Sequence, residues 1–363
     1  MNNGLPSIRS VAQRAGVSTA TVSNVLNARR SVAPELAARV REAVAELGYI
    51  ADLGAARLRS RRSRIAGLVV PDIANPFFGT LAAVVEDAAR RDGYDLLIVS
   101  TEDDPAEEAT RLRTLLTWRP AGIIVVAAGE SLPLRAQAEA AGVALVAADR
   151  IPAGPPLDVV AVDNRTASAA VLRHLLAGGR RHILLVAARR AISNVAERLA
   201  AAQAEADAAG AVLEVIEVGF TLADSRTRLA RRLAAGPAPD ALFTLNNVAT
   251  LAALETLNEA GLRVPEDVAL VGFDDPDWAR IAAPPVTTVS QPVAALGRAA
   301  WAQLAARIGG DTAPPRELRL ACTLEIRGSS ARRAPFLPDA GAFAALAGRG
   351  GRPGQDGGEG ARI

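Results

Sequence analysis

The stretch VAQRAGVSTATVSNVLN, from Val11 to Asn27, decides how the N-terminal part of the chain folds. Ser7 suits the N-cap of a helix that ends at Gly16, a residue that readily adopts the left-handed C′ conformation. Ser18 is a second N-cap candidate and begins another short helix. The inner faces of the two helices carry apolar residues at helical spacing: Ile8, Val11, Ala12 and Ala15, then Val22, Val25 and Leu26. Two short helices joined by a glycine-containing turn form a helix-turn-helix unit.

A third helix completes this N-terminal unit. It begins at Pro34, a favoured first helical residue, and ends at Gly48. Its buried face carries Leu36, Val40, Val44 and Leu47. Three such helices can enclose a small core. A helical hairpin with a purely structural role is the alternative, and periodicity alone does not exclude it.

Basic charge is concentrated in the first 64 residues, although the whole chain has a net charge of only +2. Residues 1–64 hold eleven Arg and four carboxylates, a net charge of +7. Residues 65–330 hold 25 Arg and 32 carboxylates, a net charge of −7. A small basic head on an acidic body favours contact with a polyanion such as nucleic acid. A solvated basic arm is the alternative.

The composition argues against several other classes of protein. With 50% apolar and 22% charged residues among 363, the chain can bury a large core and suggests two or three domains. No apolar run approaches the ~18 residues that cross a bilayer, and MNNGLPSIRS lacks a signal core, so we expect a cytoplasmic protein with no membrane partner. Cys322, His174 and His182 supply neither a disulfide nor a set of soft metal ligands, so we expect no metal and no cofactor.

Residues 65–330 alternate short β-branched runs with Ala-rich amphipathic stretches. The runs begin at Ile65, Leu96, Gly122, Ala144, Val159, His182, Val212, Ala241 and Val268. This alternation predicts parallel sheets with helices on both faces, and the segment is too long for one doubly wound domain. The strand VTTVS at Val286 and the strand-like LRLACTLEI at Leu318 come last.

Ligands of open α/β sheets lie beyond the carboxyl ends of the strands, so the polar and aromatic residues there are candidate ligand contacts. Those ends carry Asp72, Asn75, Phe77, Phe78, Asp149, Arg150, Asp163, Phe220, Asn246, Asp274 and Asp275. We interpret Asp163, Asp275 and Asn247 as helix caps or loop braces instead.

The quoted stretch, followed by VREAVAELGY from Val40 to Tyr49, resembles the headpiece of the lactose/galactose repressor (LacI/GalR) family of bacterial transcription regulators. The resemblance continues to about Ser330. It implies an all-α helix-turn-helix headpiece over residues 1–50 and a hinge over 51–64. It also implies a periplasmic-binding-protein-like α/β body over 65–330, with two doubly wound parallel-sheet lobes that the chain crosses three times. The tail, 331–363, is rich in Gly, Pro and Ala, and we expect it to be disordered.

The resemblance assigns DNA contacts to the second helix and to the hinge. Base reading falls on Thr19, Ala20 and Asn24, and Leu58 matches a leucine that wedges into the minor groove. The whole expected set is Ser18, Thr19, Ala20, Thr21, Ser23, Asn24, Asn27, Arg57, Leu58 and Arg59. Asn24 stands where Arg is commoner, which leaves the operator sequence open. A flexible Arg-rich linker is the alternative for the hinge.

The resemblance also assigns an effector site to the body. The expected ligand-binding residues are Phe77, Asp149, Arg198, Phe220, Asn246 and Asp274. Arg beside Asp and Asn suits vicinal hydroxyls, and an aromatic face suits the C–H face of a sugar, so we expect a sugar or sugar derivative. Asn247 stands where Asp is usual and Ala201 where Gly is usual, so the effector's identity stays open.

Together these features predict a transcription regulator, a repressor, in which a ligand in the cleft shifts the equilibrium between two lobe arrangements. A pseudo-palindromic double-stranded operator implies a homodimer. One alternative is a sugar-binding protein that serves transport, which requires export. Another is an enzyme that uses Asp149, Asp274 or Asp275 as acid and base. We do not expect an enzyme, because no nucleophile–base pair or phosphate-binding loop accompanies these carboxylates.

Overall fold

The computed structural model describes residues 6–27, 31–49 and 63–331. The chain divides into two compact units, Met1–Arg64 and Ile65–Ile363. Nearly all of the expected hinge and tail lies outside the described residues, including Arg57, Leu58 and Arg59, so their roles stay predictions.

The N-terminal unit is the predicted bundle of three helices, α1 (Ile8–Ala15), α2 (Thr19–Asn27) and α3 (Pro34–Leu47). The Ser7 side chain accepts a hydrogen bond from the Ser10 backbone N–H at 3.3 Å, and Gly16 has the left-handed φ of 64°. One fully buried valine from each helix, Val11, Val22 and Val40, meets in its core. The local sequence signals therefore set the starts of the three helices and the ends of α1 and α3. The prediction for the inner face of α2 was wrong at Leu26, which is exposed and lies outside the buried cluster.

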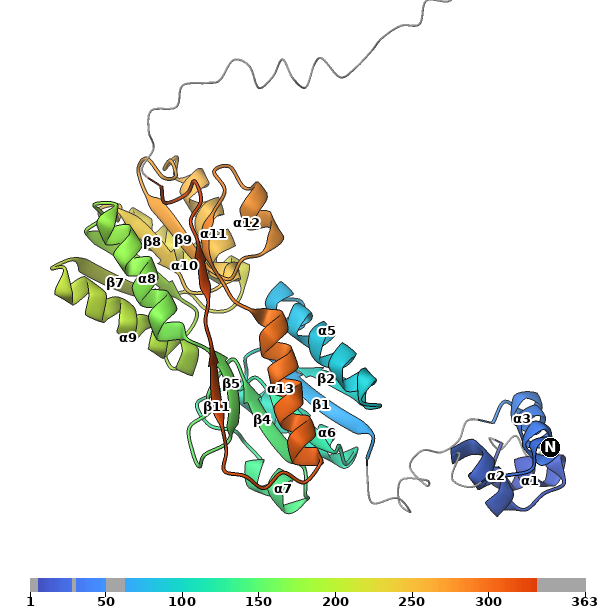
Figure 1. Cartoon of the computed structure of the whole chain (residues 1–363). Helices are drawn as coiled ribbons and strands as arrows, with labels where there is room; N and C mark the ends of the chain where they lie inside the picture. The colour runs from blue at the N-terminus through green and yellow to red at the C-terminus, as the bar shows by residue number, and fades with distance from the viewer. Residues whose placement is uncertain (1–5, 28–30, 50–62, 332–363) are drawn as a thin grey trace, which may run out of the picture. The chain divides into compact units, whose positions relative to one another are not determined.

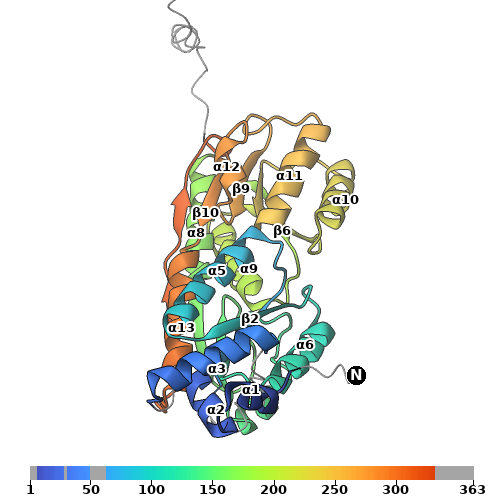
Figure 2. The ribbon, with the colours of Figure 1, turned by 90° about the vertical axis from the view of Figure 1, so that its right-hand side faces the viewer.

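The first lobe of the body is built on a six-stranded sheet in the order β11-β5-β4-β3-β1-β2. Its strands are β1 (Ile65–Val70), β2 (Asp95–Ser100), β3 (Gly122–Val125), β4 (Ala144–Ala148), β5 (Asp158–Val162) and β11 (Glu317–Leu320), all paired in parallel. Helices α5 (Pro76–Arg91) and α13 (Val293–Ile308) lie side by side on one face (Figures 1 and 2). Helices α6 (Pro105–Thr117) and α7 (Arg135–Ala140) cover the other face.

The second lobe repeats this plan with the strand order β12-β10-β9-β8-β6-β7. Its strands are β6 (His182–Ala187), β7 (Val212–Glu217), β8 (Ala241–Thr244), β9 (Ala269–Phe273), β10 (Thr287–Ser290) and β12 (Thr323–Glu325). Helices α8 (Asn164–Ala177) and α9 (Ser193–Ala208) pack on one face. On the other lie α10 (Leu222–Ala234), α11 (Asn247–Glu259) and α12 (Asp277–Ile281). The predicted class, a helical headpiece and two doubly wound lobes, is confirmed.

The chain passes between the lobes three times, after β5, after β10 and between β11 and β12 (Figure 1). The third passage corrects the prediction of one strand from Leu318. The segment is two strands, because the chain leaves the first sheet after Leu320 and enters the second sheet at Thr323. There β12 runs antiparallel to β10, so the second sheet is not wholly parallel. The three passages hold both lobes together around the space where the strands end.

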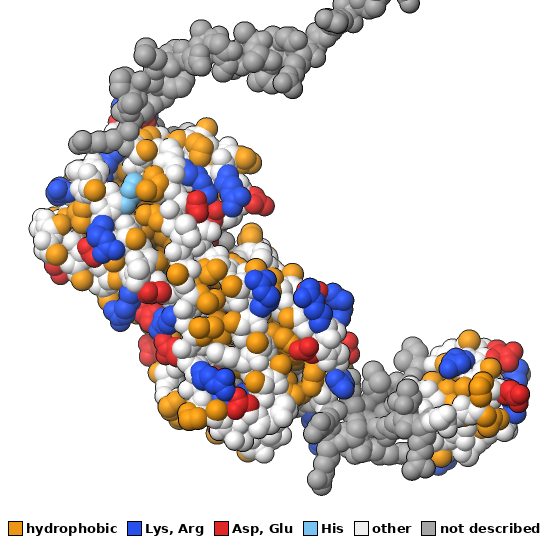
Figure 3. Space-filling model, in the orientation of Figure 1, with side chains coloured by type: hydrophobic (Ala, Val, Ile, Leu, Met, Phe, Trp, Pro, Cys, Tyr) orange, Lys and Arg blue, Asp and Glu red, His pale blue; other side chains and the backbone are white. Residues whose placement is uncertain are grey.

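Apolar side chains gather on one face of the body, over the area where α13 lies in the same view (Figure 3). Helix α13 approaches α5 closely there, since a Cβ atom at Gly297 would lie 2.9 Å from a methyl carbon of Val84. A hollow of about 660 Å³ opens between the two helices, against Trp301. No helix in residues 6–27, 31–49 or 63–331 is long and apolar enough to cross a membrane.

Candidate functional site

The start of α2 is exposed and carries small polar side chains. Ser18, Thr19 and Ala20 are exposed, whereas Thr21 and Asn24 are half-buried. The Ser18 hydroxyl caps the helix by accepting a hydrogen bond from the Thr21 backbone N–H at 3.1 Å. Small side chains at an exposed helix N-terminus can enter a major groove, and the helix's positive end favours a nearby phosphate. The fold thus exposes Thr19 and Ala20 fully and Asn24 in part, and DNA contact by each of these expected reading residues stays a prediction.

A pocket of about 440 Å³ lies between the two lobes of the body. All six residues expected to bind a ligand line it: Phe77, Asp149, Arg198, Phe220, Asn246 and Asp274. The three residues interpreted as structural do not line it. The side chain of Asp163 caps α8, Asp275 pairs with Arg327 at 2.7 Å, and Asn247 bonds to Asn75 across the lobes. Ligand binding by the six residues stays a prediction, but the fold brings them to one place.

Arg198 is the central cation of the pocket. It projects from α9 and is 3% exposed. Its Nε donates to Asn164 Oδ1 at 2.8 Å, and its Nη1 donates to the Leu245 carbonyl at 2.7 Å. The guanidinium carbon lies 3.4 Å from the centre of the Phe273 ring, a stacked arrangement that fixes its plane. Two of the three guanidinium nitrogens are therefore held by the protein, and Nη2 is left to meet a ligand.

Two carboxylates flank Arg198, and each follows a strand. Asp149 comes after β4 with a φ of 62°, and Asp274 comes after β9 with a φ of 74°. Left-handed backbone of this kind is strained for residues with a side chain and is concentrated at functional sites. Burial raises the pKa of both carboxyls above the ordinary value, and the Arg198 guanidinium opposes that rise. The pocket thus combines a buried cation with two buried acids.

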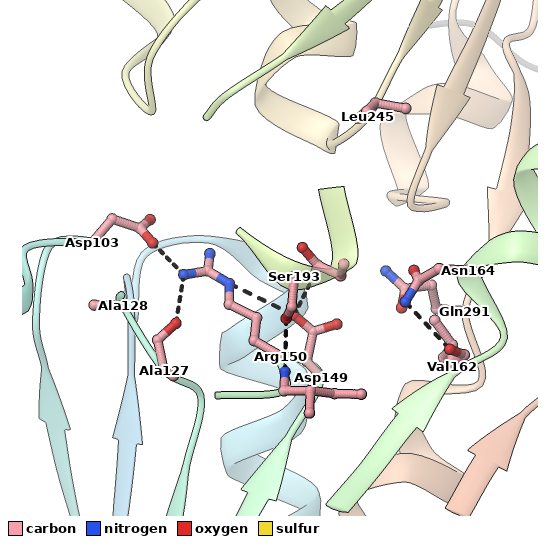
Figure 4. Close-up of polar contacts among 12 residues, drawn as sticks. Asp103, Ala127, Ala128, Asp149, Arg150, Val162, Asn164, Ser193, Leu245 and Gln291 are labelled. Carbon is pink, nitrogen blue, oxygen red and sulfur yellow. Dashed lines mark hydrogen bonds and ion pairs between the residues drawn. The ribbon is translucent and has the colours of Figure 1, made fainter. Parts of the chain in front are cut away.

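A second buried cluster supports the wall that the first lobe contributes. Arg150 Nη1 donates to Asp103 Oδ1 at 2.5 Å and to the Ala127 carbonyl at 3.0 Å (Figure 4). Beneath it, Glu108 Oε2 accepts the Ala128 N–H at 2.6 Å. Burial raises the pKa of Glu108 to about 7. These bonds fix the loop after β3 and, through it, the position of Arg150 in the pocket wall.

Several hydrogen bonds join the lobes around the pocket. Asn75 at the start of α5 and Asn247 at the start of α11 pair reciprocally, at 2.8 and 3.2 Å. The Ser193 hydroxyl accepts the Ile151 N–H at 2.7 Å (Figure 4). Asn194 Nδ2 donates to Asp149 Oδ2 at 2.9 Å. These bonds form only when the lobes are at this distance from each other. Binding of a ligand that alters the distance between the lobes is therefore coupled to the making or breaking of these bonds.

Asp103, Asn194 and Gln291 line the pocket, and the sequence reasoning did not single them out. Asn194 lies four residues before Arg198 on α9, so helical spacing places the two on one face and could have indicated it. Gln291 directly follows β10, where the strand-end rule applies equally. Asp103 follows β2 after a short turn and had no comparable signal. Among the described residues, no group of three or more His, Cys, Asp or Glu side chains is placed to hold a metal ion.

Comparisons with known proteins agree with this geometry. The profile of the family described as bacterial regulatory proteins, lacI family, matches residues 7–52, and that of a periplasmic binding protein-like domain matches residues 172–330. The HTH-type transcriptional regulator PtxS of Pseudomonas aeruginosa is 33% identical over 332 residues, which cover 91% of this chain and 97% of PtxS.

Two solved structures extend the likeness to the fold. The complex of the transcriptional regulator CelR with cellobiose is 30% identical, covers 89% of this chain and 99% of CelR, and has a TM-score of 0.67. The lac repressor dimer bound to operator and the anti-inducer ONPF is 24% identical, which supports the fold alone. It covers 91% of this chain and all of the repressor chain, with a TM-score of 0.78. The chain therefore belongs to the lacI family of bacterial regulatory proteins and is a DNA-binding transcriptional regulator of that type.

Proposed function

We propose that this regulator is a repressor whose affinity for its operator is controlled by a sugar or sugar derivative bound between the lobes. One observation carries the proposal. Five polar atoms, on Asp149, Arg150, Asn194, Arg198 and Gln291, are buried at the pocket without a hydrogen-bond partner in the part of the chain that the structure describes. Buried polar groups are rarely left unpaired, so such a cluster indicates a site built for a polar ligand.

The proposed ligand contacts are the six residues predicted from the sequence. Arg198, Asp274 and Asn246 suit neighbouring hydroxyl groups, and the half-buried ring of Phe220 suits a C–H face. The guanidinium of Arg189 lies 4.8 Å from the Phe220 ring centre and helps to hold that ring. The likeness to the CelR–cellobiose complex supports a sugar.

On the DNA side, we propose that Thr19, Ala20 and Asn24 read base edges while the neighbouring polar residues of α2 contact phosphates. We also propose the remaining DNA contacts that the resemblance implies, by Asn27 and by the hinge residues Arg57, Leu58 and Arg59, with Leu58 as the minor-groove wedge. One headpiece per chain and a pseudo-palindromic operator support a homodimer. We assign no catalytic role to the pocket carboxylates.

The test separates DNA binding from ligand response. Arg198→Ala and Asp274→Ala should keep wild-type operator affinity in fluorescence anisotropy but lose the change that the effector causes, which is typically ~5- to 150-fold. Arg173→Ala is the matched control, because Arg173 is exposed in the same lobe and pairs with Glu205. It should behave as the wild type. A normal effector response in Arg198→Ala would show that the pocket is misplaced.

A further inference from the structure

The unpartnered atoms of the pocket have a distinct hydrogen-bond polarity. Three are acceptors, namely Asp149 Oδ1, Asn194 Oδ1 and Gln291 Oε1, and two are donors, namely Arg150 Nε and Arg198 Nη2. All five atoms are buried, and in the described part of the chain none has a hydrogen-bond partner, although Arg150 Nε lies 4.0 Å from Asp149 Oδ2 as an ion pair. A ligand that satisfies this set must donate at least three hydrogen bonds and accept two.

The orientation of both amides is fixed by the carboxylates beside them. Asn194 Nδ2 donates to Asp149 Oδ2 at 2.9 Å, and Gln291 Nε2 donates to Asp274 Oδ1 at 2.6 Å. An ionised carboxylate only accepts, so in each case the amide nitrogen must face the acid and the amide oxygen must face away. The two free amide oxygens therefore follow from the chemistry of their neighbours.

The charges of the pocket also favour a ligand that donates hydrogen bonds over an anionic ligand. The described residues that line it carry five carboxylates, Asp72, Glu102, Asp103, Asp149 and Asp274, and two guanidiniums, Arg150 and Arg198. The lining thus has an excess of negative charge. A carboxylate or phosphate brought into it would add like charge and would offer no donor to the free acceptors when ionised.

The positive charge of both arginines is already opposed by carboxylates of the pocket. Arg150 Nη1 already contacts Asp103 Oδ1 at 2.5 Å. Arg198 uses Nε and Nη1 on Asn164 and Leu245, which leaves one nitrogen. Arg150 also lies 4.0 Å from Asp149, and Arg198 is attracted by both Asp149 and Asp274, so carboxylates already compensate the charge of each arginine.

We infer that the effector carries no net negative charge and donates at least three hydrogen bonds: a neutral polyhydroxylated compound or an amino sugar, not a sugar acid or a sugar phosphate. This inference rests on the proposed function and narrows its ligand class. Hydroxyl groups fit because each can both donate to an acceptor and accept from a guanidinium.

The test uses full-length protein and a metabolite extract of the source cells, separated by anion exchange into an anionic fraction and a neutral-plus-cationic fraction. Wild type and Arg198→Ala are dialysed against each fraction, and the compounds that only the wild type retains are identified by mass spectrometry. The expected compound comes from the neutral-plus-cationic fraction. A retained sugar acid or phosphate that changes operator binding overturns this inference and leaves the proposed function standing. Retention of nothing, or of a compound without effect on operator binding, overturns both.

A variant tests the free acceptor directly. Gln291→Met keeps the length of the side chain but removes its free oxygen and the donor to Asp274. It should weaken binding of the retained compound about tenfold, because a buried hydrogen bond is lost. Gln203→Met on α9 is the matched control, since Gln203 bonds to Asp207 away from the pocket lining, and it should leave affinity unchanged. Unchanged affinity in Gln291→Met would contradict the acceptor assignment.

Discussion

Glu108 allows a prediction of stability against pH that can be worked from the structure. Its side chain has no exposed surface, and only Oε2 has a partner, the Ala128 N–H at 2.6 Å. Burial raises the pKa of Glu108 from 4.5 to about 7. Between these values the folded protein holds a proton that the unfolded chain has released, so the free energy of unfolding falls as pH rises through this window. The penalty is absent below pH 4.5 and complete above pH 7.

Glu108→Gln should remove this penalty. Glutamine stays neutral and can still accept from the Ala128 N–H, so the variant lacks the pH-dependent loss. At 1.36 kcal/mol for each unit of pKa, the shift from 4.5 to about 7 corresponds to about 3 kcal/mol. We expect Glu108→Gln to be more stable than the wild type by up to about 3 kcal/mol at pH 8, with little difference at pH 4.5.

Urea unfolding followed by tryptophan fluorescence measures this difference in the body, which contains Glu108. The three tryptophans, Trp118, Trp278 and Trp301, all belong to the body as well. Glu107→Gln is the control, since Glu107 is the adjacent acid on α6 and pairs with Arg111 at 2.7 Å. It should change stability by less than ~1 kcal/mol at either pH. Equal effects of Glu108→Gln at pH 4.5 and pH 8, or a loss of stability at pH 8, would refute the reasoning.

Three further changes test other parts of the structure. Gly272→Ala should lower the free energy of unfolding by about 1–3 kcal/mol in urea, because its Cβ would lie 2.5 Å from Thr250 Oγ1; an unchanged midpoint would contradict this packing. Asn247→Ala removes both interlobe bonds to Asn75 and should weaken effector binding in calorimetry by up to about 2 kcal/mol. Wild-type affinity would show that this pair does not favour the ligand-bound arrangement. Ser18→Ala should destabilise the start of α2 by about 1 kcal/mol and speed hydrogen exchange of its first amides, and exchange at the wild-type rate would contradict the cap.

The elements most accurately predicted from the sequence are those whose signals are local. Ser7 and Gly16 bound α1, and Pro34 and Gly48 bound α3, because a cap, a left-handed residue and a helix-starting proline act within a few residues of their own position. The first strand of the body begins at Ile65 as predicted. Five of the six expected pocket residues also lie together, because parallel strands bring their carboxyl ends to one edge, whereas Arg198 lies within α9 and was expected only from the family resemblance.

Features that depend on the pairing of distant segments could not be predicted. The strand predicted from Leu318 divides because the chain changes sheets there, and nothing in LRLACTLEI marks the change. The bond between Asn75 and Asn247 joins residues 172 positions apart. The strand-end rule could have indicated Gln291 itself, but its bond to Asp274 forms only because β10 lies beside β9. Each of these depends on which strands become neighbours, a property that hydrophobic periodicity does not encode.

Reciprocal linkage tests the central claim, that the pocket and the DNA-binding helix share one equilibrium. The affinity for operator is measured with and without the retained compound, and the affinity for the compound is measured with and without operator, at one salt concentration. A shared equilibrium requires the same factor in both measurements, which we expect to be at least about fivefold, and a factor of one in Arg198→Ala at the same compound concentration. A factor of one in both measurements on the wild type would contradict it.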